Sequence, residues 1–181
     1  MQNSKKNVRF LAQAAVIAAL YTVLTYLANT VNLAYGFVQF RFSEALTILP
    51  IFTPAAIPGL TLGCFLSNLG SPFGVFDWVF GSLATLLAAV FCRMFSKIRI
   101  KNIPWLSLFM PVLFNAVIIG FEISCFSSSN QFGLENFSWV VFWTNALSVG
   151  LGELVICYVL GIPFYFTVQR INHKYPQLLQ S

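Results

Sequence analysis

The chain has 181 residues, of which 58% are hydrophobic and only 8% are charged, and its mean hydropathy is +0.79. Because soluble domains carry about 25% charged residues, this composition excludes a water-soluble globular protein and predicts an integral membrane protein surrounded by lipid. The net charge of +5 does not indicate a nucleic-acid partner, since basic residues in membrane proteins mainly set the orientation of the chain.

Four apolar segments are long enough to cross a hydrocarbon core of about 30 Å as single helices. We place them at residues 8–33, 76–96, 103–126 and 137–168. The first is too long for the apolar region of a signal peptide and ends without a small-residue cleavage pattern, so we expect it to remain in the mature protein. Apolar segments recur from end to end, which predicts one transmembrane domain over residues 1–181.

A further apolar stretch, residues 43–70, is interrupted by Pro50, Pro54 and Pro58. Each proline removes a helical hydrogen bond and clashes with the preceding turn. The stretch is long for one crossing of the membrane and short for two, so hydropathy alone leaves the number of crossings open.

The basic residues decide this number. They form three clusters, at residues 5–9, 93–101 and 170–174. If residues 43–70 crossed once, the first two clusters would lie on opposite sides, against the tendency of short basic loops to stay cytoplasmic. Two short helices, at residues 43–53 and 54–70, place nine of the ten basic residues in the cytoplasm, and only Arg41 outside. We therefore predict an all-α bundle of six transmembrane helices with both termini in the cytoplasm.

All five acidic residues of the chain lie outside the cytoplasmic parts of this arrangement. They are Glu44, Asp77, Glu122, Glu135 and Glu153. Ionisable groups within a membrane are costly and commonly mark a binding site or a pathway. Asn115 and Glu122 are seven residues apart and therefore point within about 20° of each other on one helix face. This pattern predicts a polar site that is open to the outside.

We assign ten residues to this predicted site: Arg41, Glu44, Asn68, Asp77, Trp78, Asn115, Glu122, Trp143, Asn145 and Glu153. Structural alternatives stay open for several of them. Glu122, Glu153 and Asn115 also suit hydrogen bonds between helices, and Asp77 also suits a helix N-cap. The tryptophans also suit an aromatic belt at the membrane interface. Arg41 also suits a local pair with Glu44 that holds the outer loop in place.

The sequence contains no motif of an enzyme. It lacks the G-x-x-x-x-G-K-[ST] loop of ATPases and the H-E-x-x-H zinc motif, and its one histidine, His173, lies in the basic tail. The four cysteines have no C-x-x-C spacing and are interpreted as packing residues. We expect no catalytic residue, metal or cofactor, so binding and translocation fit better than catalysis.

The first helix carries small residues one turn apart, Ala14 with Ala18 and Ala15 with Ala19. Such pairs let another helix approach closely. The partner is either a second protein or a neighbouring helix of the same bundle.

Taken together, the segment "QFRFSEALTILP", six helices, the alanine pairs and the lack of a nucleotide motif resemble a known family. They resemble the substrate-binding S components of energy-coupling factor (ECF) transporters, which are ABC-type importers used in vitamin uptake. Within this group the segment is similar to the QueT family, whose cargo is a queuosine precursor, a deazaguanine. The resemblance covers residues 8–170.

The resemblance implies a multi-pass protein of a prokaryotic plasma membrane that captures its cargo outside and docks on a coupling protein and two ATPases. ATP hydrolysis by these partners drives release into the cytoplasm, and the four alanines form the docking face. In this hypothesis Glu122 accepts hydrogen bonds from the guanine-like donors, and Asn115 and Asn145 bind the ring edge. Trp143 stacks on the ring, and Glu44 or Asp77 meets a cationic arm or holds the gate.

Other functions remain open from the sequence. The chain also suits an S component for another vitamin or nucleobase, or a solitary carrier that is driven by a proton or sodium gradient. A membrane scaffold that binds no small molecule is a further alternative.

Overall fold

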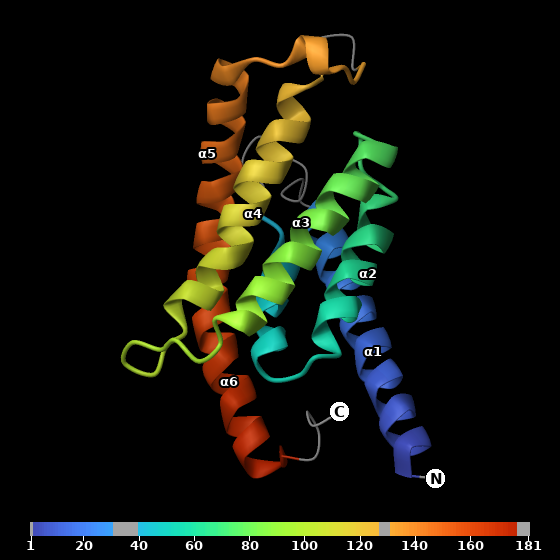
Figure 1. Ribbon diagram of the computed structural model, residues 1–181, viewed down its shortest axis with the longest axis vertical. Coiled ribbons are helices and arrows are strands. Elements are labelled where there is room, and N and C mark those ends of the chain that lie inside the picture. The colour runs from blue at the N-terminus through green and yellow to red at the C-terminus, as the bar shows by residue number, and fades with distance from the viewer. Residues whose placement is uncertain (1, 31–39, 127–130, 177–181) are drawn as a thin grey trace.

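A computed structural model shows a bundle of helices (Figure 1). It describes residues 2–30, 40–126 and 131–176. The elements are α1 (Gln2–Thr30), the 3₁₀ helix η1 (Phe42–Ile51), α2 (Ala56–Asn68), α3 (Val75–Met94), α4 (Trp105–Ser124), the short 3₁₀ turn η2 (Leu134–Asn136), α5 (Trp139–Val155), the π-helix η3 (Ile156–Leu160) and α6 (Gly161–Lys174). No β-strand occurs in the described ranges, which confirms the all-α prediction.

The helices run alternately up and down the long axis of the molecule (Figure 1). The chain goes up in α1, down in η1, up in α2, down in α3, up in α4 and down through α5 and α6, so α1 begins at the end where α6 stops. This arrangement agrees with an even number of passes and with both termini on one side. The number of membrane crossings stays a prediction.

Four of the described helices are long and apolar enough to cross a membrane, namely Lys6–Thr30, Val75–Met94, Trp105–Ser124 and Trp139–Lys174. The predicted ranges 76–96 and 103–126 coincide closely with α3 and α4. The last predicted helix, 137–168, corresponds to α5, η3 and α6 together, and residues 31–33 of the first lie outside the described residues. The two short predicted helices correspond to η1 and α2.

The element η1 lies at the centre of the bundle, in contact with α1, α2, α3, α4, η3 and α6. It is a 3₁₀ helix of ten residues that contains Pro50, and runs longer than three or four residues are uncommon for this conformation. Its Ser43, Glu44 and Thr47 are buried, and the Thr47 hydroxyl donates to the Glu44 carbonyl at 2.5 Å. Surrounding helices thus shield an irregular and polar segment from lipid, as such a backbone requires.

Close packing between α1 and α2 depends on small residues. A Cβ atom at Gly63 would lie 2.8 Å from the Ala18 carbonyl oxygen, and one at Gly59 would lie 2.8 Å from that of Ala14. Ala14 and Ala18 are correspondingly buried, whereas Ala15 and Ala19 are exposed. The sequence grouped all four alanines in one docking face. The structure instead divides them between a contact inside the bundle and an outer surface.

Buried apolar residues hold the remaining elements together. One core cluster joins α1, η1, α2 and α6 through Tyr21, Leu46, Leu60 and Val168. All four cysteines are buried and free, which agrees with their interpretation as packing residues.

Gly63→Ala should destabilise the protein, because its new methyl group would also lie 2.7 Å from the Tyr21 Cβ atom. We expect a loss of about 1–3 kcal/mol from overpacking, measured as a lower midpoint of thermal unfolding in detergent. Gly150→Ala is the matched control, since it makes the same change within a helix and its Cβ atom would lie 3.3 Å from that of Ala116. Equal midpoints for the two variants would contradict the close α1–α2 contact.

Candidate binding site

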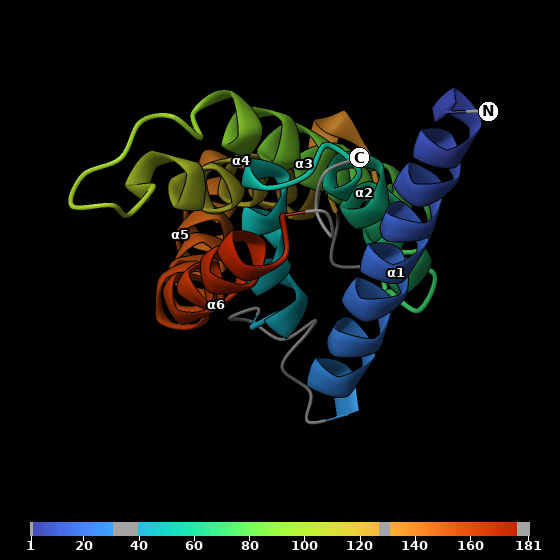
Figure 2. The same cartoon turned by 90° about the horizontal axis from the view of Figure 1, so that it is seen from below.

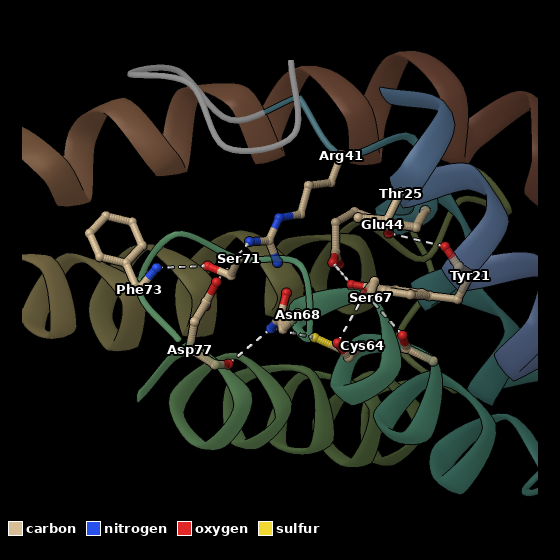
Figure 3. Close-up of polar contacts among 12 residues, drawn as sticks. Tyr21, Thr25, Arg41, Glu44, Cys64, Ser67, Asn68, Ser71, Phe73 and Asp77 are labelled. Atoms are coloured by element: carbon tan, nitrogen blue, oxygen red, sulfur yellow. Dashed lines mark hydrogen bonds and ion pairs between the residues drawn. The ribbon is translucent and has the colours of Figure 1, made fainter. Parts of the chain in front are cut away.

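A buried ion pair joins the segment before η1 to the first turn of α3. An Nη atom of Arg41 lies 3.7 Å from an Oδ atom of Asp77, and the two side chains are 4% and 3% exposed. Figure 3 shows the arginine reaching across the interior toward Asp77. Taking two charges out of water is costly, and a nearby opposite charge offsets this cost.

The ion pair differs from the pairing of Arg41 with Glu44 that the sequence suggested. The Glu44 N–H does donate to the Arg41 carbonyl at 3.0 Å, and the guanidinium charge acts on the Glu44 carboxyl. The Glu44 carboxyl, however, accepts a hydrogen bond from the Tyr21 hydroxyl of α1. Arg41 therefore links to a residue far away in the chain, and Glu44 links η1 to the first helix.

Asn68 fixes the position of Asp77 from the end of α2. Its side chain is fully buried, and its Nδ2 atom donates to the main-chain carbonyl of Asp77 at 2.9 Å. A Cβ atom at Gly81 would collide with this amide and lie 3.1 Å from the Asp77 carboxyl. The contact between α2 and α3 therefore requires the glycine at position 81. The Asn68 Oδ1 atom has no hydrogen-bond partner among the described residues.

Two hydrogen bonds attach η1 to α1. The Tyr21 hydroxyl bonds to Glu44, and the hydroxyls of Thr25 and Ser43 share a hydrogen bond of 2.7 Å. Tyr21 is fully buried, and the sequence analysis did not select it. Its spacing of four from Thr25 places both hydroxyls on one face of an apolar helix, which is the signal that could have identified it.

Glu122 and Asn115 lie deep in the bundle on α4, 0% and 5% exposed. Neither carboxyl oxygen of Glu122 has a hydrogen-bond partner within the described residues, and neither has the Asn115 Nδ2 atom. The charges of Asp77 and Arg41 both act on Glu122. An unsatisfied buried polar group costs about 1–3 kcal/mol. Protein interiors normally satisfy such groups, so this arrangement is typical of a site that binds a polar ligand.

Glu153 lies in the last turn of α5, three residues before the π-helix η3 begins at Ile156. It is buried, and the Cys157 Sγ atom contacts its Oε2 atom at 3.8 Å and the Glu44 carbonyl at 4.0 Å. The charges of Glu44 and Arg41 act on it. The groups that act on Glu153 thus lie in η1, in η3 and at Arg41, the residue before η1. π-Helical turns frequently occur at functional sites.

Three of the predicted site residues lie outside the buried polar group. We use this name for the buried side chains of Tyr21, Arg41, Glu44, Asn68, Asp77, Asn115, Glu122 and Glu153. Trp143 is 58% exposed and packs edge-to-face on Phe142, which agrees with the alternative of an aromatic belt. Asn145 is partly buried, and its amide donates to the Val141 carbonyl of its own helix at 2.8 Å. Trp78 is half-buried and packs edge-to-face on Phe65 of α2. The ring-stacking role of Trp143 therefore has no support from its position.

The charges of the buried group are unequal. Among the buried residues that the structure describes, four carry a carboxyl group and one carries a guanidinium group. The four acids are Glu44, Asp77, Glu122 and Glu153. An interior of this kind favours a ligand that is rich in hydrogen-bond donors or positively charged, and disfavours an anion.

A family model described as QueT transporter matches residues 11–170. The chain belongs to the QueT transporter family. The matched region contains every residue of the buried polar group, from Tyr21 to Glu153. The family is one of transporters, which agrees with the lack of enzyme motifs in the sequence.

One similar protein is the queuosine precursor transporter QueT of Lactococcus lactis subsp. cremoris (strain MG1363). It is 40% identical over 73 residues, which cover 40% of this QueT-family chain and 43% of the relative. The match thus spans less than half of the relative's length. No solved structure matches the chain significantly.

Asp77→Asn should destabilise the protein strongly, because it leaves the buried Arg41 without this carboxylate. The bond from Asn68 survives, since it goes to the main chain of residue 77. We expect a loss of about 3–5 kcal/mol and a lower midpoint of thermal unfolding. Glu135→Gln, at an exposed acid, is the control.

The double variant Arg41→Met/Asp77→Leu should be more stable than Asp77→Asn, since it removes both buried charges together. An Asp77→Asn variant that is as stable as the wild type would show that the ion pair does not hold η1 and α3 together.

Proposed function

We propose that the protein captures a queuosine precursor, a deazaguanine, outside a prokaryotic cell and delivers it through the plasma membrane into the cytoplasm. The observation that carries this proposal is the buried Glu122 carboxyl group, which lies on the same helix face as the Asn115 Nδ2 atom. Among the described residues, neither oxygen of this carboxyl group nor the Asn115 Nδ2 atom has a hydrogen-bond partner. The function named for the Lactococcus lactis relative supports the same cargo.

The hydrogen-bonding groups of the site complement those of a deazaguanine. The ring presents adjacent N–H donors, which a carboxylate accepts in pairs, and Glu122 offers both oxygens. The ring carbonyl needs a donor, and the Asn115 Nδ2 atom supplies one. The Asn68 Oδ1 atom of α2 is a further acceptor that has no hydrogen-bond partner among the described residues.

A cationic arm of the cargo is best met by Glu44. Asp77 is engaged by Arg41, whereas the Glu44 Oε2 atom has no hydrogen-bond partner among the described residues. Charge-assisted hydrogen bonds of this kind are about twice as strong as neutral ones. Arg41 and Asn68 then act by holding Asp77 and the walls of the site in place.

We further propose that import is driven by ATP hydrolysis on partner proteins, as for an S component of an ECF transporter. The sequence has no nucleotide-binding motif of its own. Ala15 and Ala19 form an exposed small-residue surface on α1, whereas Ala14 and Ala18 are buried against α2. The proposed docking face for a coupling protein is therefore centred on Ala15 and Ala19.

One observation favours a second function, a carrier coupled to an ion gradient. The described buried residues include four acids and only one arginine. Buried carboxyl groups serve as proton relays in many transporters. Uptake without a coupling protein and ATPases that depends on a proton or sodium gradient would identify this carrier.

Glu122→Gln should weaken the binding of a deazaguanine by at least about tenfold, since it replaces one of the two carboxyl oxygens by an NH2 group, which only donates. Calorimetric titration of the isolated protein measures this affinity against a panel of deazaguanines, guanine and vitamins. Glu135→Gln is the control and should bind like the wild type. Unchanged affinity in Glu122→Gln would contradict the site, and a vitamin bound in place of every deazaguanine would favour a different S component.

Ala15→Trp and Ala19→Trp should abolish uptake in cells that contain the coupling module and leave cargo binding unchanged. The reason is that a bulky ring blocks close approach of a partner helix without entering the bundle. Val79→Trp, at a 59% exposed position of α3, controls for the added ring. Normal uptake in both alanine variants would place the docking face elsewhere.

A further inference from the structure

A long groove, separate from the buried polar group, opens between α1 on one side and η1 and α6 on the other. Its volume is about 770 Å³. Figure 2 shows α1 standing apart from α6 when the molecule is seen from below. The groove is lined by one face of α1, by Leu46 and Leu49 of η1, and by Phe164 of α6.

The polar residues of the groove gather at one end. Arg9, Gln13 and Thr53 line this end, where the Thr53 hydroxyl bonds to the Gln13 side chain at 3.1 Å. Above them α1 contributes only apolar residues, from Val16 to Leu24. The polar end is also the end of the molecule at which α1 begins and α6 stops.

The apolar part of the groove covers most of the height of one leaflet. Val16 and Leu24 are eight residues apart, which corresponds to about 12 Å along an α-helix. Half of a hydrocarbon core of about 30 Å is about 15 Å. Val16 and Leu20 on its rim are 58% and 49% exposed, so the groove opens toward the surrounding lipid.

We propose that this groove binds one anionic phospholipid of the cytoplasmic leaflet, with an acyl chain along α1 and the phosphate on Arg9. A guanidinium group binds a phosphate with paired hydrogen bonds. Lys6 is exposed one turn before Arg9 and adds a second positive charge at the same end. Anionic lipids concentrate where basic residues face the cytoplasmic surface.

The lipid and the partner helix use different faces of α1. Arg9, Gln13, Val16 and Leu20 recur every three or four residues and form the groove face. Ala14 and Ala18 point to α2, and the exposed Ala15 and Ala19 lie between these two faces. A bound lipid therefore leaves the proposed docking surface open and fills the space between α1 and α6.

Native mass spectrometry of the purified protein tests the headgroup. The protein is exposed to an equal mixture of phosphatidylglycerol and phosphatidylcholine with identical acyl chains. The wild type should retain phosphatidylglycerol preferentially, and Arg9→Gln should lower its occupancy about fivefold. Lys97→Gln, which removes an exposed charge outside the groove, should retain it like the wild type. Equal retention of both lipids, or equal behaviour of the two variants, would overturn the proposal.

A second pair of variants tests the acyl chain. Val16→Phe narrows the groove and should reduce the occupancy of the retained lipid at least threefold. Leu11→Phe adds the same ring at a 70% exposed position of α1 outside the groove, and should have no effect. Undiminished lipid occupancy in Val16→Phe would overturn the proposal. So would a dimer of the wild type that holds no lipid and that Val16→Phe dissociates, because a second copy of the chain would then fill the groove.

Discussion

The architecture depends on how one arginine is kept inside a membrane protein. A guanidinium group cannot lose its charge, so Arg41 needs a negative partner wherever it is buried. Asp77 provides this partner from α3, and Asn68 of α2 holds the main chain of Asp77. Because three elements meet at this pair, it sets the relative positions of η1, α2 and α3. The Glu122 carboxyl, whose oxygens have no hydrogen-bond partner in the described part of the chain, then faces a region that already contains one cation and one anion.

The candidate site is also connected to the first helix. Glu44 belongs to η1, takes part in the electrostatics of the buried group and bonds to Tyr21 of α1. The face of α1 that carries Tyr21 packs against the glycines of α2, and its other faces carry the exposed alanines and the lipid-facing groove. The proposed cargo site, docking surface and lipid site are therefore arranged around one helix, each on a different side of it.

The sequence predicted what composition and helix spacing determine. It predicted the all-helical class, the long helices and the buried acids, because apolar length and the cost of buried charge are local properties. It did not predict the partner of Arg41, which lies 36 positions further along the chain and is defined only by the packing of α3 against η1. The small residues on α1 form two pairs, Ala14 with Ala18 and Ala15 with Ala19, and the sequence does not show which pair is buried. Only the contact with Gly59 and Gly63 of α2 identifies Ala14 and Ala18 as the buried pair. Trp143 has the residue type of a stacking platform, but its helix turns it outward.

The conformation of η1 has a geometric consequence for the cation at its start. A 3₁₀ helix rises about 2.0 Å per residue, compared with about 1.5 Å in an α-helix. Ten residues rewound as an α-helix would therefore be about 5 Å shorter. The Arg93 side chain donates to the Pro50 carbonyl and so holds the far end of η1. The shortening would therefore move Arg41 about 5 Å toward Pro50, which is more than the 3.7 Å between its guanidinium group and the Asp77 carboxyl. The winding of one short central segment thus sets the depth at which the buried cation lies.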